Sequence, residues 1–477
     1  MKKRIAAEWE PTIGVLVAWP TNLPHLMLKA LSEDTVIYFL VPNDKEQEDC
    51  TEWMGKWGIP MDRIRFIRIG AQGASYCWPR DWGPHPCFDE SGKYYLLSPR
   101  FWYGDPFCVL EDEKLCIATS ETDLAERTND GIEDATPTYI GEELGLDVVE
   151  LGFAFTGGNL FSDGVNNLIS SKLMLMENEV AGVDNEEFFK LVNSQTGMGQ
   201  YTVVPNFEDF SLQHVDCMMK MLDEERILVA RPPEGHRHRE LYDYIAYEIL
   251  GKTLNCYGRF YEILRLDTNY HQNGPTEFGD LHPYVNAVIL NRSVYVPLGD
   301  IPQDEIALRQ WQEAMPGYNI RGFYSHHDEE PVEKRANEEH PDAFPMGDGQ
   351  DAGWLGFDAV HCRTRAVWDP QMLHIDFARI PNEVCEAETY PLNVRIVDYS
   401  KAGLVPDKLL VFYRKKGENV WNNKHLEKTK THEIYRCELT AEKGDTIEYY
   451  VSATDNSGRT EKRPYPAPDG FYSFTVK

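Results

Sequence analysis

Cys362 stands between a histidine and an arginine in the segment Trp354–Thr364. A thiol flanked by His361 and Arg363 would lie in an electropositive setting, which lowers a thiol pKa from its free value of about 8.5. The thiolate is the form that attacks efficiently. Because most single cysteines are simply buried and inert, residue type alone does not decide. The pattern nevertheless makes Cys362 a candidate nucleophile.

A carboxylate lies between two tryptophans in the segment Trp78-Pro-Arg80-Asp81-Trp82. Aromatic faces together with a carboxylate suit a flat cation such as guanidinium. An internal contact between Arg80 and Asp81 in a structural turn is an equally good interpretation of this segment alone. Trp78, Arg80 and Asp81 are therefore candidates for binding a cation.

The segment Gln213-His214-Val-Asp216-Cys217 supplies a second histidine and a second carboxylate. On a strand, His214 and Asp216 would share one face. A carboxylate there could orient the imidazole or hold part of a cation, and histidine is the natural proton carrier near neutral pH. A metal site would need further ligands, which the neighbouring sequence does not offer, so we expect no metal.

Two further segments carry polar residues at unusual places in the apolar pattern. Gly158 and Asn159 follow Thr156-Gly157, and such paired glycines allow a tight turn beneath a site. A phosphate-binding loop is excluded because no Gly-Lys-Ser/Thr follows. Asn286 opens the apolar run 283–291, where it could contact a substrate or the nucleophile, or could merely cap a strand.

Together these residues favour hydrolysis of a guanidinium group to a urea and ammonia. The cation stays protonated at any physiological pH, so carboxylates must orient it. It is also a resonance-stabilised, poor electrophile, which requires a strong soft nucleophile and a proton donor for the departing ammonia.

Net charge limits the partners of the chain. The 477 residues include 47 basic and 78 acidic side chains, which give a formal charge of −31. Such a surface repels nucleic-acid phosphate and anionic lipid and favours a cationic substrate. No apolar run approaches the length of a membrane span, and the N-terminus lacks a signal-peptide core. We therefore expect a cytoplasmic protein, unless a leader has been removed upstream of residue 1.

The element pattern predicts two domains. Residues 1–380 alternate apolar strands and amphipathic helices, which indicates an α/β or α+β domain without choosing between a doubly wound sheet and a propeller. Residues 381–477 alternate as strands separated by turns, which predicts a small β-sandwich. The acidic segment 326–351 is predicted to be an exposed loop, either a lid over the site or a surface insertion.

The strands predicted in the first domain share Val, Ile, Leu and Tyr enrichment and end at Gly, Pro or Asn. They are 35–41, 64–69, 94–97, 148–151, 226–230, 261–266, 287–290 and 294–297, and the helices predicted there include 240–250 and 303–315. In the second domain, the predicted strands are 392–397, 408–413, 434–439, 446–453 and 471–476.

The motifs, in this order, resemble those of the Porphyromonas-type peptidylarginine deiminases, relatives of the agmatine deiminases in the guanidine-modifying superfamily. The matching motifs are Trp78-x-Arg80-Asp81, Thr156-Gly-Gly-Asn159 with Asp163-Gly164, His214-Val-Asp216-Cys217, Pro283-Tyr-x-Asn286 and His361-Cys362-Arg363-Thr364. The resemblance continues into the C-terminal region, which agmatine deiminases normally lack.

This resemblance implies a five-bladed α/β propeller (pentein) followed by an immunoglobulin-like β-sandwich. It also implies that Cys362 attacks the guanidinium carbon and that His214 acts as general acid and then as base. Asp81 and Asp216 would hold the guanidinium nitrogens, and Asn286 would support the nucleophile and substrate. No metal or organic cofactor is implied for a hydrolase of this kind, which releases citrulline and ammonia through a covalent thiouronium.

One segment departs from the family pattern. The relatives carry an Arg-Pro-Arg segment that grips the substrate's C-terminal carboxylate, whereas Tyr103 and Asp105 stand at those two arginine positions here. Loss of two cations removes that grip, and an added carboxylate favours an amine. An agmatine deiminase making N-carbamoylputrescine is therefore the first alternative. An amidinotransferase and a non-catalytic binding module are the others.

Overall fold

The computed structural model describes residues 3–69, 78–100, 107–111, 114–118, 132–207, 213–270, 280–325, 332, 354 and 358–477. Tyr103, Asp105 and all of the predicted 326–351 loop except Val332 lie outside these residues. The chain divides into two compact units, Met1–Trp311 with Ile320–Trp368, and Gln312–Asn319 with Asp369–Lys477. Within the described ranges, no helix combines the length and apolar character needed to cross a bilayer.

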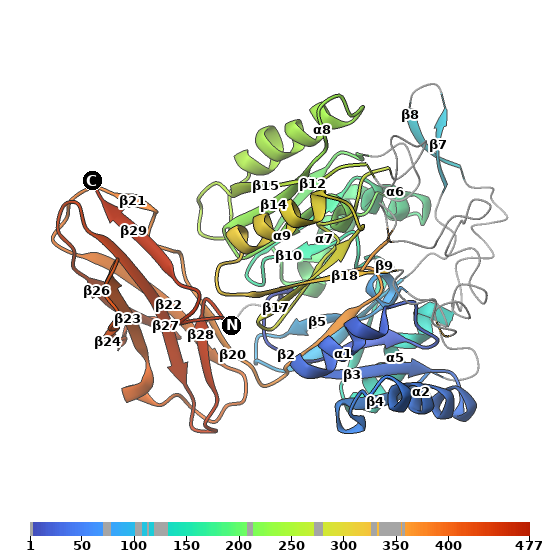
Figure 1. The fold of residues 1–477 in the computed structure, drawn as a ribbon, viewed down its shortest axis with the longest axis horizontal. Coiled ribbons are helices and arrows are strands. Elements are labelled where there is room, and N and C mark those ends of the chain that lie inside the picture. The colour runs from blue at the N-terminus through green and yellow to red at the C-terminus, as the bar shows by residue number, and fades with distance from the viewer. Residues whose placement is uncertain are drawn as a thin grey trace. The chain divides into compact units, whose positions relative to one another are not determined.

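The described strands of the first unit form five sheets of three or four strands and one hairpin (Figure 1). In sheet order, they are β1 (Arg4–Ile5), β5 (His85–Phe88), β6 (Tyr94–Arg100) and β9 (Val148–Ala154); β10 (Phe161–Ser162), β11 (Asn167–Ser171) and β12 (Gln200–Val204); β13 (Met219–Met221), β14 (Arg226–Arg231) and β15 (Glu262–Asp267); β16 (Val288–Leu290), β17 (Ser293–Leu298) and β18 (Asn319–Tyr324); β19 (Arg365–Trp368), β2 (Thr12–Ala18), β3 (Val36–Val41) and β4 (Ile64–Arg68); and the hairpin of β7 (Phe107–Glu111) and β8 (Lys114–Ala118).

A repeated arrangement underlies these sheets. In the sheets of β11 and β14, the central strand pairs antiparallel with a short preceding strand and parallel with a following strand. A parallel neighbour requires a crossover, which helices provide. The helices of the first unit are α1 (His25–Asp34), α2 (Asp44–Lys56), α3 (Pro79–Trp82), α5 (Ile132–Leu144), α6 (Leu173–Val180), α7 (Asn185–Thr196), α8 (Arg239–Tyr244) and α9 (Gln303–Ala314), with shorter helical turns η1 (Met61–Arg63), η2 (Val215–Cys217), η3 (Ile245–Ile249) and η4 (Leu250–Lys252).

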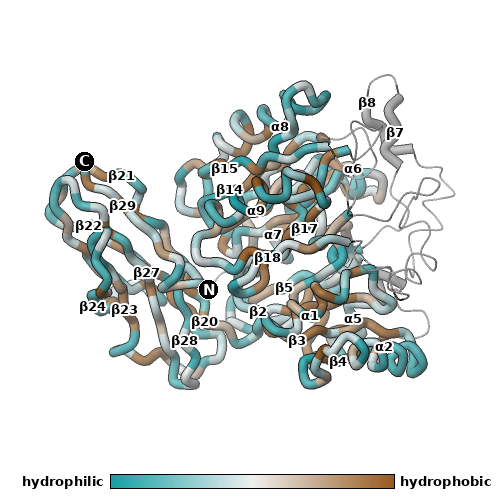
Figure 2. Tube along the Cα trace, in the orientation of Figure 1, coloured by the Kyte–Doolittle hydropathy of each residue, from teal (hydrophilic) through white to brown (hydrophobic). Residues whose placement is uncertain are grey.

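Local sequence signals explain several of these elements. The side chain of Asn43 accepts a hydrogen bond at the start of α2, and that of Asp184 does so at the start of α7. Gly197 ends α7 in the left-handed conformation at φ 75°. Figure 2 shows α2 as mostly hydrophilic, in contrast to the apolar strand β3 on which it packs. The predicted helix 240–250 is present, but it changes from α-helical in α8 to a π-helical turn in η3.

The second unit contains two β-sheets that enclose one hydrophobic core, as the all-β prediction for the C-terminal region requires. In sheet order, the strands are β20 (Leu373–Asp376), β22 (Tyr390–Asp398), β26 (Ile434–Leu439) and β25 (Glu427–Lys428) in one, and β21 (Glu383–Val384), β29 (Tyr472–Val476), β27 (Thr446–Thr454), β23 (Leu410–Lys415) and β24 (Asn422–His425), with β28 (Thr460–Arg463) beside β27, in the other.

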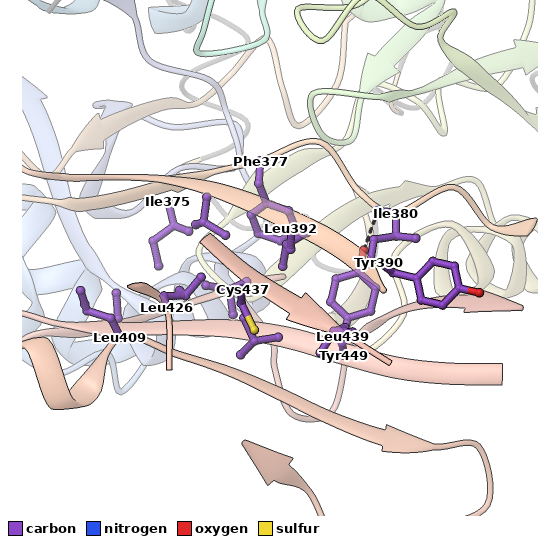
Figure 3. Packing of buried hydrophobic residues seen from close by; sticks show 14 of the residues in the cluster. Ile375, Phe377, Ile380, Tyr390, Leu392, Leu409, Leu426, Cys437, Leu439 and Tyr449 are labelled. Carbon is purple, nitrogen blue, oxygen red and sulfur yellow. Dashed lines mark hydrogen bonds between the residues drawn. The ribbon is translucent and has the colours of Figure 1, made fainter. Parts of the chain in front are cut away.

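Figure 3 shows this core at close range, with Leu392 and Ile375 from one sheet and Tyr449 from the other among its side chains. The Tyr449 hydroxyl also accepts a hydrogen bond from the backbone N–H of Ile380 at 2.9 Å. Strand β20 precedes residue 381 yet pairs with β22, so the β-sandwich includes residues that lie before the boundary expected from the sequence.

Candidate active site

The candidate nucleophile lies in a tight turn just before β19. Cys362 is buried, and the backbone N–H groups of Arg363 and Thr364 donate to the carbonyls of Ala359 and His361. The Thr364 hydroxyl donates to the Val360 carbonyl at 2.8 Å. These bonds fix the turn that presents the Cys362 thiol.

Asn286, which lies three residues after Pro283, contacts this turn with its side chain. Its Nδ2 lies 3.2 Å from Cys362 Sγ, and its Oδ1 accepts the backbone N–H of His361 at 3.0 Å. The His361 N–H also lies 3.1 Å from the Asn286 carbonyl oxygen. The Asn286 side chain therefore contacts both the sulfur and the backbone of this turn, and its support of the nucleophile in catalysis stays a prediction.

Asp81 lies in α3, which begins with Pro79, a residue well suited to the first turn of a helix. Its Oδ1 accepts the backbone N–H of Gly158 at 3.0 Å and lies 3.5 Å from His214 Nδ1. The Asp81 carbonyl accepts the N–H of Gly157. The paired glycines thus bring one carboxylate and one imidazole together.

Asp216 and His214 do not lie on a strand, which is the conformation in which the two side chains would have shared one face. His214 precedes the 3-10 turn η2, which contains Asp216, because the backbone folds back so that the Cys217 N–H donates to the His214 carbonyl. Asp216 Oδ2 lies 2.7 Å from His361 Nδ1 and 3.6 Å from Cys362 Sγ. Asp216 Oδ1 lies 3.5 Å from the thiol of the half-buried Cys217.

Gly158 marks the space that these groups share. A methyl group on its Cα would overlap Asp81 Oδ1 and would lie 2.8 Å from His214 Nδ1 and 3.2 Å from Asp216 Oδ2. Three functional side chains from distant segments therefore converge beside a residue without a side chain. Hydrogen-bond donors of a cation would suit acceptors placed in this way, because two of the three converging groups are carboxylates.

The remaining candidate residues have mixed placements. Arg80 is buried, and its Nε donates to the His361 carbonyl at 3.1 Å, so it braces the nucleophile turn. Asn159 Oδ1 accepts from the N–H groups of Ser171 and Val215 beneath the site. Trp78 lies half-buried at the start of α3. Contact of Trp78, Arg80, Gly158 and Asn159 with a substrate stays a prediction.

The expectation that His361 and Arg363 lower the pKa of Cys362 is wrong. A hydrogen bond from Cys217 does lower it, but burial and the charges of Asp216, Asp358 and Asp81 outweigh that bond and raise the pKa of Cys362 to about 11. Both sequence neighbours have other partners. The Arg363 guanidinium pairs with Asp358 at 2.9 Å, and both His361 ring nitrogens contact carboxylates.

This electrostatic setting predicts how the thiol reacts with a neutral reagent. We expect alkylation of Cys362 by iodoacetamide to accelerate about tenfold per pH unit from pH 7 to 9, because only the thiolate reacts and its pKa lies above that range. Mass spectrometry of the peptide containing Cys362 would follow the reaction, with the exposed Cys385 as an internal control for reagent. A plateau by pH 8 would contradict this prediction.

Two residues near the site were missed by the sequence reasoning. Glu8 Oε2 lies 2.7 Å from His361 Nε2, and Lys220 Nζ lies 3.2 Å from the same Glu8 oxygen. Both residues are buried. The available signal was a charge in an apolar setting, since Lys220 lies among three methionines and a leucine, and Glu8 lies between Ala7 and Trp9.

The described residues do not bring three or more His, Cys, Asp or Glu side chains into an arrangement that could hold a metal ion. The site brings together a thiol, an imidazole and two carboxylates. These are the groups needed to bind a cationic guanidinium, attack its carbon and protonate a leaving amine.

Known proteins share this sequence pattern and fold. A protein of Vibrio parahaemolyticus assigned as an agmatine deiminase is 22% identical over 348 residues, which are 66% of this chain and 89% of the relative. The crystal structure of a Porphyromonas gingivalis protein assigned as an arginine deiminase has a TM-score of 0.57 at 17% identity, covering 77% of this chain and 99% of that one.

The structure of an Enterococcus faecalis agmatine deiminase also has a TM-score of 0.57 at 17% identity, covering 77% of this chain and 96% of that one. The first unit therefore has the α/β pentein-like fold of these structures. Residues 4–327 match the family described as Porphyromonas-type peptidyl-arginine deiminase, which is more than half of the chain. The chain belongs to this family of guanidino-group deiminases, which is related to the agmatine deiminases.

Proposed function

We propose that the protein hydrolyses the guanidinium group of arginine in a peptide or protein, producing citrulline and ammonia. The observation that carries this proposal is the convergence of Asp81, His214 and Asp216 on the space beside Gly158, with the Cys362 thiol against Asp216. Two carboxylates in one buried space favour a cation, and the adjacent thiol supplies the nucleophile.

In the proposed mechanism, Asp81 and Asp216 accept hydrogen bonds from the guanidinium nitrogens and orient the central carbon toward Cys362. Arrival of the cation favours the thiolate, because an opposite charge stabilises the ionised form. His214 faces the same space, so it is placed to accept the thiol proton and return it to the departing nitrogen.

The bonds change in two steps. Cys362 Sγ forms a bond to the guanidinium carbon, and the carbon–nitrogen bond of the tetrahedral intermediate breaks to release ammonia, which leaves a covalent thiouronium. Water, deprotonated by His214, then adds to the same carbon, and the carbon–sulfur bond breaks. The products are the ureido compound and free Cys362, so water is the only co-reactant and no oxidant is consumed.

The substrate ranking rests on two opposing observations. Membership of the Porphyromonas-type family and the presence of a C-terminal β-sandwich favour peptide-linked arginine. The agmatine deiminases among the relatives, and Tyr103 and Asp105 in place of two arginines, favour agmatine. We rank peptide arginine first, because the family match extends to residue 327.

An assay for ureido product and ammonia would test the proposal. Wild-type protein would be incubated with a peptide containing internal arginine, a peptide ending in arginine, and agmatine. We expect equal amounts of ureido product and ammonia, with the largest kcat/KM for one of the peptides.

Each other outcome has a distinct meaning. Preference for agmatine would replace the substrate but keep the chemistry. Ornithine or putrescine formed without ammonia, in the presence of an acceptor amine, would indicate amidino transfer. No product from any of the three would overturn the proposed function.

A further inference from the structure

His361 lies between two carboxylates in the interior of the first unit. Its Nδ1 is 2.7 Å from Asp216 Oδ2, and its Nε2 is 2.7 Å from Glu8 Oε2. All three side chains are buried. We call Glu8, His361 and Asp216 the buried array. It combines a residue from the first ten of the chain with His361, the residue directly before Cys362, and with Asp216.

The two contacts fix how many protons the buried array holds. Each 2.7 Å separation between a ring nitrogen and a carboxylate oxygen requires one proton, since two lone pairs would otherwise face each other. Two carboxylates and one imidazole that share two protons carry a net charge of −1, wherever those protons reside. The buried Lys220 ammonium, 3.2 Å from Glu8, balances this charge.

Glu8 is itself fixed by the backbone of a further element. Its Oε1 accepts the N–H of Ile289 in β16 at 2.9 Å. Asn286, which contacts Cys362 Sγ, lies three residues before Ile289 along the same segment. Glu8 thus connects two parts of the site. One is the segment of Asn286 and Ile289, and the other is the His361 ring, which contacts Asp216.

Asp216 Oδ2 is the oxygen that the buried array controls. It shares a hydrogen bond with His361 Nδ1, and it is also the Asp216 oxygen nearest to Gly158. Burial raises the pKa of Asp216, but the hydrogen bond to His361 and the charges of His361, His214 and Lys220 together outweigh burial and hold it below the usual value. Burial and the charge of Arg80 in turn lower the pKa of His361, so the hydrogen bond is the firmer part of its support for Asp216. Without a hydrogen-bonded His361, this buried carboxylate would be less oriented and easier to protonate.

We propose that Glu8 and His361 are positioning residues that keep Asp216 oriented and ionised for binding the guanidinium group. The inference rests on the proposed function and assigns to it two residues that act through Asp216. Glu8 contributes by fixing the His361 ring so that Nδ1 points at Asp216. Among the described residues, the charged and titratable groups around Asp216 are Asp81, His214, Cys217, Lys220, His361 and Cys362, with Glu8 and Arg80 next to His361.

The test replaces Glu8 by the isosteric Gln. An amide at this position can hydrogen-bond His361 but lacks the negative charge that anchors its ring. We expect kcat/KM for the preferred substrate to fall about 30-fold, mostly through KM, because guanidinium binding weakens. The acid limb of the kcat/KM profile should move about one unit to higher pH, because a less supported Asp216 protonates more easily.

Glu10→Gln is the matched control. Glu10 is a buried carboxylate two residues away, but it pairs with Arg4 at 2.7 Å and lies outside the buried array. Its loss should lower the unfolding midpoint without moving the acid limb. A Glu8→Gln variant whose acid limb and kcat/KM stay within twofold of wild type would overturn the inference.

A second comparison separates positioning from folding. In a His361→Asn background, Glu8→Gln should change kcat/KM less than twofold, because the proposed effect of Glu8 on Asp216 passes through His361. If Glu8→Gln still lowered kcat/KM about 30-fold in the His361→Asn protein, Glu8 would not act on Asp216 through His361, and the inference would be refuted. If the wild-type protein makes no ureido product, the proposed function itself has failed. The wild-type assay alone shows this, so the two failures can be told apart.

Discussion

Replacing Gly158 with alanine is expected to lower kcat/KM by at least about 10³-fold while leaving the protein folded. The added methyl would overlap Asp81 Oδ1 and come within 2.8 Å of His214 Nδ1 and 3.2 Å of Asp216 Oδ2. It would displace these groups and fill the space proposed for the guanidinium group. Misplacement of a single reacting group by about 1 Å can already cost about 10²-fold.

Gly152 provides the control for this substitution. It lies on β9 in the same unit, and a methyl group there would meet no atom within 4 Å. Gly152→Ala should therefore keep kcat/KM within twofold of wild type. Thermal unfolding would confirm that both variants are folded. If Gly158→Ala kept more than a tenth of wild-type activity, the substrate would not bind where the carboxylates converge.

Cys362→Ala is expected to lower kcat by about 10⁵-fold, in line with the loss of a nucleophile from other covalent enzymes. The variant keeps Asp81, His214 and Asp216, so it should still bind the substrate. Acid quenching during turnover, followed by mass spectrometry, should detect on wild-type Cys362 an adduct equal to the substrate minus ammonia. The same adduct should be absent from the variant.

Two other cysteines make this test specific. Cys385 is exposed and lies in the second unit, so Cys385→Ser should retain full activity. Cys217→Ser should lose only a few-fold, because Cys217 supports Cys362 by a hydrogen bond and forms no covalent bond. Turnover by Cys362→Ala at more than about a hundredth of the wild-type rate would contradict the role of the thiol.

Residue patterns along the chain were sufficient to predict several of the strands and five of the groups that the structure brings together, which are Asp81, His214, Asp216, Asn286 and Cys362. Strands such as β3, β4 and β14 follow from Val and Ile runs, because apolar runs bounded by turn residues are typical of buried strands. Asn286 was a candidate because a polar residue opened an apolar run, and the structure places it on Cys362.

The sequence could not predict the direction in which side chains point. Arg363 is adjacent to Cys362 in sequence, but the turn directs its guanidinium to Asp358 and the Asn22 carbonyl. Arg80 likewise turns to the His361 carbonyl. The thiol pKa therefore follows from the hydrogen bond of Cys217, from burial and from nearby carboxylates. Of these carboxylates, Asp216 and Asp81 lie 146 and 281 residues away along the chain, whereas Asp358 lies only four residues away. Glu8 was missed for the same reason.

The pairing of β19 with β2 has a consequence for how activity is acquired. Arg365 of β19 pairs with Leu16 of β2, so the strand that directly follows Cys362 joins a sheet begun near the N-terminus. Bringing such distant segments together is entropically costly and slow compared with local contacts. On refolding, or as the chain emerges from the ribosome, strand and helix content should therefore be regained before catalytic competence.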